Sequence, residues 1–184
     1  MGRVIRPEEL CGEDTLAVAR SLLGKALVRT TKTQEHRLLI NEVEAYDGES
    51  DLACHASKGR TKRTEVLYHA GGIWYVYLCY GIHEMLNLVV GPSGHPAAIL
   101  IRGAGDIVGP GRLTKRLEID RRLNGLSADP ASGLHLKDVG IEVPRRKIKT
   151  SRRIGVDYAG PVWAIKPWRF QFETVGFVPG GGPL

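Results

Sequence analysis

Five carboxylates gather in a short stretch of a chain that is otherwise basic. The 184-residue chain carries 26 Lys and Arg against 20 Asp and Glu, a formal net charge of +6, which suits a polyanionic partner. The acidic residues of the stretch are Glu42, Glu44, Asp47, Glu49 and Asp51. Carboxylates repel the phosphates of nucleic acid, so this cluster needs a local chemical role. One candidate role is a hard-metal site in a nuclease. Its ligands would be Glu42, Glu44, Asp51 and His55.

The second stretch that could do chemistry is aromatic and runs from Ile73 to Gly81. It holds three of the six tyrosines and one of the three tryptophans. Its composition predicts a strand, whose alternation places Tyr75 and Tyr77 on one face and Trp74 and Tyr80 on the other. Such a strand could be a core strand, although each buried tyrosine hydroxyl would then need a partner. It could also stack bases in an RNA- or DNA-binding module without catalysis.

Basic residues form three clusters along the chain. The first holds Lys58, Arg60, Lys62 and Arg63; the second Arg112, Lys115, Arg116, Arg121 and Arg122; the third Arg145, Arg146, Lys147, Lys149, Arg152 and Arg153. One cluster alone is typical of a solvated face. Three clusters in a chain of this length favour contact with phosphates.

The elements that must position these residues follow from hydrophobic periodicity and from turn residues. We expect helices at residues 15–23, 64–68 and 112–123, and strands at 26–30, 37–46, 73–81, 84–90, 97–102, 134–136, 140–143, 146–150 and 169–173. Alternation along 37–46 places Ile40 on the face of Glu44 and Tyr46, opposite Val43. The pattern predicts one α+β domain over residues 1–175 built on antiparallel strands, and a Gly/Pro-rich tail over 176–184.

Composition excludes several classes of protein. No apolar run approaches the roughly 20 residues of a membrane span, and the first residues lack the apolar core of a signal peptide. The three cysteines form no CxxC pair, which argues for a reducing compartment and against a cysteine-rich zinc site. We therefore expect a cytoplasmic protein, associated with the nucleoid if the source is bacterial, that does not bind a membrane.

Several blocks of the sequence resemble the alkyladenine (3-methylpurine) DNA glycosylases. The blocks are residues 42–46 (EVEAY), 53–55 (ACH), 75–81 (YVYLCYG), 109–113 (GPGRL), 153–156 (RIGV) and 166–170 (KPWRF). The resemblance implies a single compact, monomeric domain with a curved antiparallel sheet and flanking helices. It implies no metal and no diffusible cofactor. It also implies the activity: flipping alkylated or deaminated purines out of double-stranded DNA and hydrolysing the N-glycosidic bond to leave an abasic site.

The same resemblance assigns roles to individual residues. Glu44 would activate the attacking water, and Arg102 and the Ile154 carbonyl would hold that water. Arg102 beside Glu44 would keep the carboxylate ionised. The residues placed around the flipped base are Tyr46, His55 and Tyr77, with Asn87 at the minor-groove edge of the purine.

Contacts with DNA and the type of glycosylase complete the expectations. Tyr80 would be the wedge inserted into the duplex. The residues expected on the DNA backbone are Lys58, Arg60, Arg112, Lys115 and Arg116. No lysine stands out as a nucleophile, which predicts a monofunctional enzyme without strand cleavage. The resemblance gives Glu42 no role.

Overall fold

The computed structural model describes residues 2–173; the expected tail at 176–184 lies outside them. The strands are β1 (Arg3–Val4), β2 (Ala26–Thr30), β3 (Glu35–Asp47), β4 (Ile73–Cys79), β5 (His83–Val89), β6 (Ala97–Ala104), β7 (Ile107–Val108), β8 (Leu134–Asp138), β9 (Lys149–Ser151) and β10 (Arg169–Gln171). The α-helices are α1 (Thr15–Leu22), α2 (Pro110–Arg116) and α3 (Gly160–Trp163). Short 3₁₀ helices cover Pro7–Leu10, His55–Lys58, Glu65–Tyr68, Arg121–Leu123, Pro130–Ser132, Arg145–Lys147 and Asp157–Ala159.

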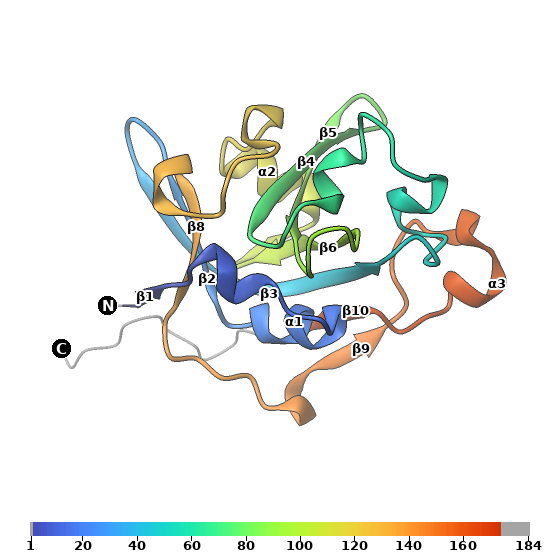
Figure 1. Ribbon diagram of the computed structural model, residues 1–184. Coiled ribbons are helices and arrows are strands. Elements are labelled where there is room, and N and C mark those ends of the chain that lie inside the picture. Colours follow the sequence, from blue (N-terminus) through green and yellow to red (C-terminus); the bar gives the residue numbers. More distant parts are fainter. Residues whose placement is uncertain (1, 174–184) are drawn as a thin grey trace.

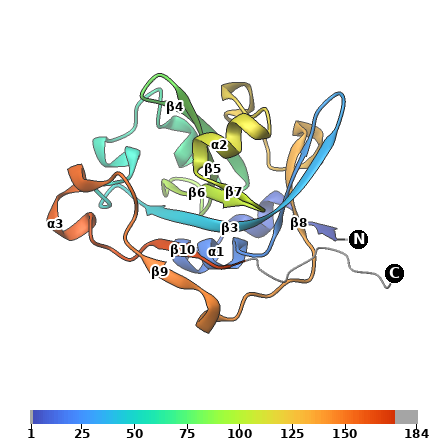
Figure 2. The same cartoon turned by 180° about the vertical axis from the view of Figure 1, so that it is seen from behind.

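One long strand, β3, organises the antiparallel sheet. The strand order is β1-β8-β2-β3-β6-β5-β4, and β10 pairs with β3 and β9. The first part of β3 pairs with β2, and its later part lies between β6 and β10. The sheet therefore curls around β3, which Figures 1 and 2 show crossing the molecule from end to end. Helix α1 packs against β3 and α2 against β5 and β6. The expected α+β domain with a curved antiparallel sheet and flanking helices is confirmed.

The two faces of β4 enter different clusters of buried side chains. Trp74 and Val76 belong to the main core, whereas Tyr75 and Tyr77 belong to a second cluster. Trp74 is fully buried, and its indole N–H donates to the carbonyl of Leu134 at 2.9 Å. The predicted alternation of β4 is thus confirmed up to Tyr77. Among the described residues, no helix is long and apolar enough to cross a membrane.

The alternation predicted for β3 is wrong at Ile40. The pairing of β3 with β6 is irregular on both sides of Glu42, as at a β-bulge. Ile40, Val43 and Ala45 consequently share the main core. The bulge moves Glu42 and Glu44 to the other face, away from Ile40. Glu42 and Glu44 therefore share the face of β3 that points away from the main core, while Ile40, Val43 and Ala45 stay in that core.

The helix expected at 112–123 ends at Arg116. Glu118 has φ +50°, and the amide of Ile119 donates to the carbonyl of Thr114. This turn lets both Leu117 and Ile119 enter the core, which two residues spaced by two cannot do on one face of a helix. A 3₁₀ helix at 121–123 follows instead.

Three other expected elements also differ from the structure. Residues 140–143 form no strand, because Gly140 has φ +76° and its amide bonds to the Asp138 side chain, which ends β8. The strand expected at 146–150 is a 3₁₀ helix followed by β9. The helix expected at 64–68 is a 3₁₀ helix that begins at Glu65. Its Thr64 hydroxyl donates to the carbonyl of Gly59 and does not cap the helix.

Candidate active site

The register of the sheet brings the predicted site residues onto one row. Across five adjacent strands, the directly opposed residues are Arg169, Glu44, Leu100, Asn87 and Tyr75. Opposed residues on antiparallel strands point to the same face. The buried carboxylate of β3 and the aromatic side chain of Tyr75 on β4 therefore lie on the same face of the sheet.

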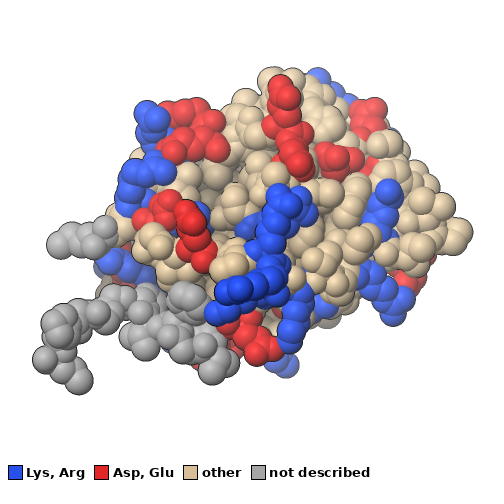
Figure 3. All heavy atoms as spheres, turned by 90° about the horizontal axis from the view of Figure 1, so that it is seen from below, with Lys and Arg blue, Asp and Glu red and all other residues tan. Residues whose placement is uncertain are grey.

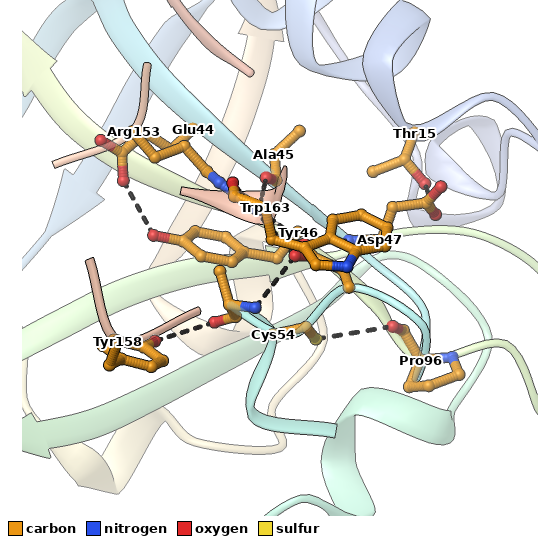
Figure 4. A network of polar contacts seen from close by, with 12 residues as sticks. Thr15, Glu44, Ala45, Tyr46, Asp47, Cys54, Pro96, Arg153, Tyr158 and Trp163 are labelled. Atoms are coloured by element: carbon orange, nitrogen blue, oxygen red, sulfur yellow. Dashed lines mark hydrogen bonds and ion pairs between the residues drawn. The ribbon is translucent and has the colours of Figure 1, made fainter. Parts of the chain in front are cut away.

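This face carries an open cleft of about 700 Å³. The sequence-predicted residues that line it are Tyr46, His55, Lys58, Tyr77, Tyr80, Arg102 and Ile154. A smaller cavity of about 40 Å³ is lined by Tyr46, His55, Tyr77 and Asn87, and also by Tyr75 and Tyr158. Tyr158 donates from its hydroxyl to the carbonyl of Ala53 at 3.0 Å, closing one edge (Figure 4). The structure thus collects the predicted base-binding residues around two spaces that share Tyr46, His55 and Tyr77 in their linings.

Glu44 is fully buried beside the cleft and is held by three groups. The Tyr46 hydroxyl donates to its Oε2 at 2.9 Å (Figure 4). The Ile154 N–H donates to its Oε1 at 2.8 Å. The Arg102 Nε lies 3.4 Å from Oε1. Burial raises the pKa of Glu44, and it outweighs the opposing effects of Arg102, the Ile154 N–H and the Tyr46 hydroxyl. Arg102 therefore acts in the expected direction, but the net shift of the pKa is upward.

Glu42 has a clear partner set that the sequence did not reveal. Its Oε1 accepts hydrogen bonds from Arg102 Nε at 2.9 Å and from Arg169 Nε at 2.7 Å. These arginines lie 60 and 127 residues away in the chain, so only the folded sheet brings the three groups together. Glu42 is nearly buried. It thereby fixes the direction of the Arg102 guanidinium, which reaches on to Glu44.

Three aromatic rings pack against each other at the other wall. The His55 and Tyr77 ring centroids are 4.6 Å apart at 71°, and Tyr75 lies 5.4 Å from Tyr77. His55 Nδ1 is 2.9 Å from the hydroxyl of Tyr75. The resemblance assigns no role to Tyr75. Burial, with a smaller contribution from Arg63, lowers the pKa of His55 to about 4. The imidazole is therefore neutral at neutral pH. The Asn87 side chain donates to the carbonyl of Tyr75 at 3.2 Å.

The basic clusters divide into free and engaged side chains. Arg112, Lys115 and Arg116 are exposed on α2, and Lys58 is exposed at the cleft. Arg60 instead pairs with Glu65 at 2.6 Å and lies over the Tyr68 ring.

Arg153 belongs to the third basic cluster in the sequence, but its side chain is buried and is not a surface cation. Its guanidinium takes both oxygens of Asp51, at 2.5 and 2.8 Å. Asp51 and Glu42 are thus both bound to arginines. Among residues 2–173, no three His, Cys, Asp or Glu side chains form a group that could hold a metal ion. The ligand set of the nuclease hypothesis does not converge in this structure.

A curved sheet with a buried carboxylate beside an aromatic cleft places this chain among α+β proteins with an enzyme-like site. The sequence profile of the methylpurine-DNA glycosylase family matches residues 9–108 and 105–175. The chain belongs to that family.

Individual relatives are similar over most of both chains and are provisionally named 3-methyladenine DNA glycosylase. One from Psychrobacter cryohalolentis is 41% identical over 86% of this chain and 86% of its own. One from Methanocella arvoryzae is 42% identical over 90% and 91%. One from Myxococcus xanthus is 42% identical over 96% and 94%.

Proposed function

We propose that this protein is a monofunctional DNA glycosylase that flips alkylated or deaminated purines out of duplex DNA and hydrolyses their N-glycosidic bond. The observation that carries the proposal is the ring of donors around Glu44 at an aromatic cleft. Membership of the family and the names of the relatives, which specify 3-methyladenine, support the substrate class.

The cleft suits a flipped, damaged purine. Tyr46, His55 and Tyr77 offer ring faces and edges for a planar base. A cationic alkylated purine is attracted by an aromatic ring, and a charged imidazole would oppose that attraction. The depressed pKa of His55 keeps the imidazole neutral. The neutral His55 ring therefore does not repel an extruded base, whether that base is cationic or neutral.

The proposed chemistry needs one water, Glu44 of β3 and Arg102 of β6. The ionised Glu44 accepts a proton from water as the water oxygen bonds to the sugar C1′. The electron pair of the breaking C1′–N bond leaves with the base. The carboxylate also stabilises the oxocarbenium-like sugar, as in glycoside hydrolysis. Arg102, oriented by Glu42, would hold the water next to Glu44.

The direct test uses duplexes carrying 3-methyladenine, 7-methylguanine, hypoxanthine or ethenoadenine. We expect the protein to convert at least one of them to an abasic site, so that strand breaks appear only after treatment with alkali. Breaks without alkali would show lyase activity and contradict the monofunctional assignment. No excision of any lesion would contradict the proposed function.

The pH dependence of excision should report the raised pKa of Glu44. The base must be ionised, so the single-turnover rate should fall as the pH drops, with a midpoint above 4.5, the ordinary value for glutamate. His55 titrates lower, near 4, and does not set this midpoint. In Tyr46→Phe the carboxylate loses one donor, which should move the midpoint further upward. A wild-type midpoint below 4.5 would mean that another group limits the rate.

Duplex affinity should fall steeply with salt, because bound Lys and Arg release counterions from DNA. Replacing Arg112, Lys115 and Arg116 with Gln should reduce the slope of log K against log salt by about 3. The matched control replaces Arg145, Arg146 and Lys147, which are exposed on a 3₁₀ helix just before β9. On the face seen from below, groups of Lys and Arg side chains lie among groups of Asp and Glu side chains (Figure 3). A slope changed only by the control triple would place the DNA on that face.

A further inference from the structure

A buried ion pair contacts several segments that line or flank the cleft. Asp51 and Arg153 have fully buried side chains. The Arg153 Nη1 donates to Asp51 Oδ2 at 2.5 Å and Nη2 to Oδ1 at 2.8 Å. Nη1 also donates to the carbonyl of Ala45 at 2.8 Å, and Nη2 to that of Trp163 at 3.3 Å. One guanidinium thus joins β3, the loop after it and α3 (Figure 4).

The pair is connected to the chemical wall through the backbone. Arg153 directly precedes Ile154, whose N–H donates to Glu44 Oε1 at 2.8 Å. Fixing the guanidinium of Arg153 therefore also fixes the peptide that holds the carboxylate. The Ile154 side chain is itself half-exposed and has little packing to hold this peptide by itself.

The pair is also connected to the base-binding wall by two routes. The guanidinium carbon of Arg153 lies 4.8 Å from the centroid of the Tyr46 ring, a stacking contact that holds the ring in place. Asp51 accepts hydrogen bonds from the amides of Asp47 at 3.2 Å and Ala53 at 3.0 Å. These bonds close the loop that leads into His55.

We infer that Arg153 and Asp51 are positioning residues that hold Glu44, Tyr46 and His55 in one mutual arrangement. This inference rests on the proposed function but names residues that do not themselves touch the substrate. Arginine is specific to the task, because its planar fork serves a carboxylate, two carbonyls and a ring at once. Lysine carries the same charge but has neither the fork nor the flat face.

The first test is Arg153→Lys, which leaves Asp51 with a cationic partner. Displacements of about 1 Å can lower a rate by about 100-fold, so we expect the single-turnover rate to fall by about 10- to 100-fold. Affinity for a duplex carrying an abasic analogue should change by less than about threefold. Displacement of the Ile154 N–H weakens its hydrogen bond to the ionised Glu44 carboxylate. The midpoint of the acid limb of the pH–rate profile should therefore move to higher pH.

A second variant and a control separate positioning from stability. Asp51→Asn with Arg153→Met removes both charges and leaves neither ion unpaired; it should lose rate in the same way. The control is Asp138→Asn, which breaks the Lys25–Asp138 pair at 3.0 Å; neither residue of this pair lines the cleft. That variant should lower the melting temperature without moving the acid limb.

The Glu44 pKa can also be followed in the free protein by NMR of ¹³C-labelled glutamate carboxyls. We expect it to be higher in both Arg153 variants than in the wild type. Rates within about twofold of wild type together with an unchanged Glu44 pKa in both variants would overturn the inference. A shifted Glu44 pKa in a protein whose wild type excises none of the lesions would instead overturn the proposed function alone.

Discussion

Glu44→Gln should lower the single-turnover rate of excision by about 100- to 10,000-fold, the range that a general base contributes. The amide keeps the shape of the side chain and can still accept from the Ile154 N–H, which lies 2.8 Å from Oε1. It cannot take a proton from the attacking water. Binding to a duplex with an abasic analogue should stay nearly intact, because the aromatic residues and surface cations provide that affinity.

The stability of the same variant provides an internal control. Burial raises the pKa of Glu44, so the ionised form is disfavoured in the folded protein relative to the unfolded chain. The ionised carboxylate therefore destabilises the fold at any pH above its raised pKa, and this effect disappears below the unfolded value. At neutral pH, Glu44→Gln should melt at the wild-type temperature or above it. Lost activity in a protein that remains this stable cannot be attributed to unfolding.

Glu42→Gln is the matched comparison, because in the proposed mechanism Glu42 contributes only by orienting Arg102. A smaller loss of rate is expected there, since Arg169 and Arg102 can still donate to an amide oxygen. If Glu44→Gln retained substantial single-turnover activity while Glu42→Gln did not, the general base would have to be reassigned to Glu42.

The sequence predicts the strands that carry the chemistry better than it predicts their surroundings. The alternation of β4 depends on local side-chain types, and the structure confirms it from Trp74 to Tyr77. The bulge near Glu42 depends on the pairing with β6, which no periodicity in β3 can show. Without that bulge, Ile40 and Glu44 would lie on the same face of β3.

Buried polar pairs are the other part that the sequence could not supply. Arg153 and Asp51 are 102 residues apart, and in the sequence each belongs to a cluster of like charge. A run of basic residues predicts an exposed segment, because most Lys and Arg side chains are exposed. Only the tertiary contacts distinguish Arg153 from Arg152, which is exposed. The resemblance assigns the groups expected next to the substrate, whereas the structure shows the groups that hold those residues in place.

The conformation of Tyr80 suggests a role outside the fold. It follows the last residue of β4, has φ +50° and is 88% exposed. A left-handed conformation costs a residue with a Cβ about 1 kcal/mol or more, and an exposed ring gains little from burial in return. The ring lines the open cleft, next to the residues proposed to hold the base. Strained, exposed aromatic residues of this kind occur where function maintains them.

Tyr80→Ser should therefore lower excision from a fully paired duplex by about 10- to 100-fold, because the ring would fill the gap left by the flipped nucleotide. Unstacking a base costs a few kcal/mol per step, and a wedge offsets part of that cost. A lesion in an already unpaired bulge needs no such help, so its excision should fall only slightly. Tyr80→Phe keeps the ring and should behave like wild type on both substrates.

The melting temperature decides between this role and a structural one. A ring that is 88% exposed buries little area in the free protein, so Tyr80→Ser should change stability by less than about 0.5 kcal/mol. Tyr80→Gly should be equally stable or more stable, because glycine adopts a positive φ without strain. Equal losses of rate on paired and bulged substrates, or a large fall in melting temperature, would mean that Tyr80 supports the end of β4 and does not enter the duplex.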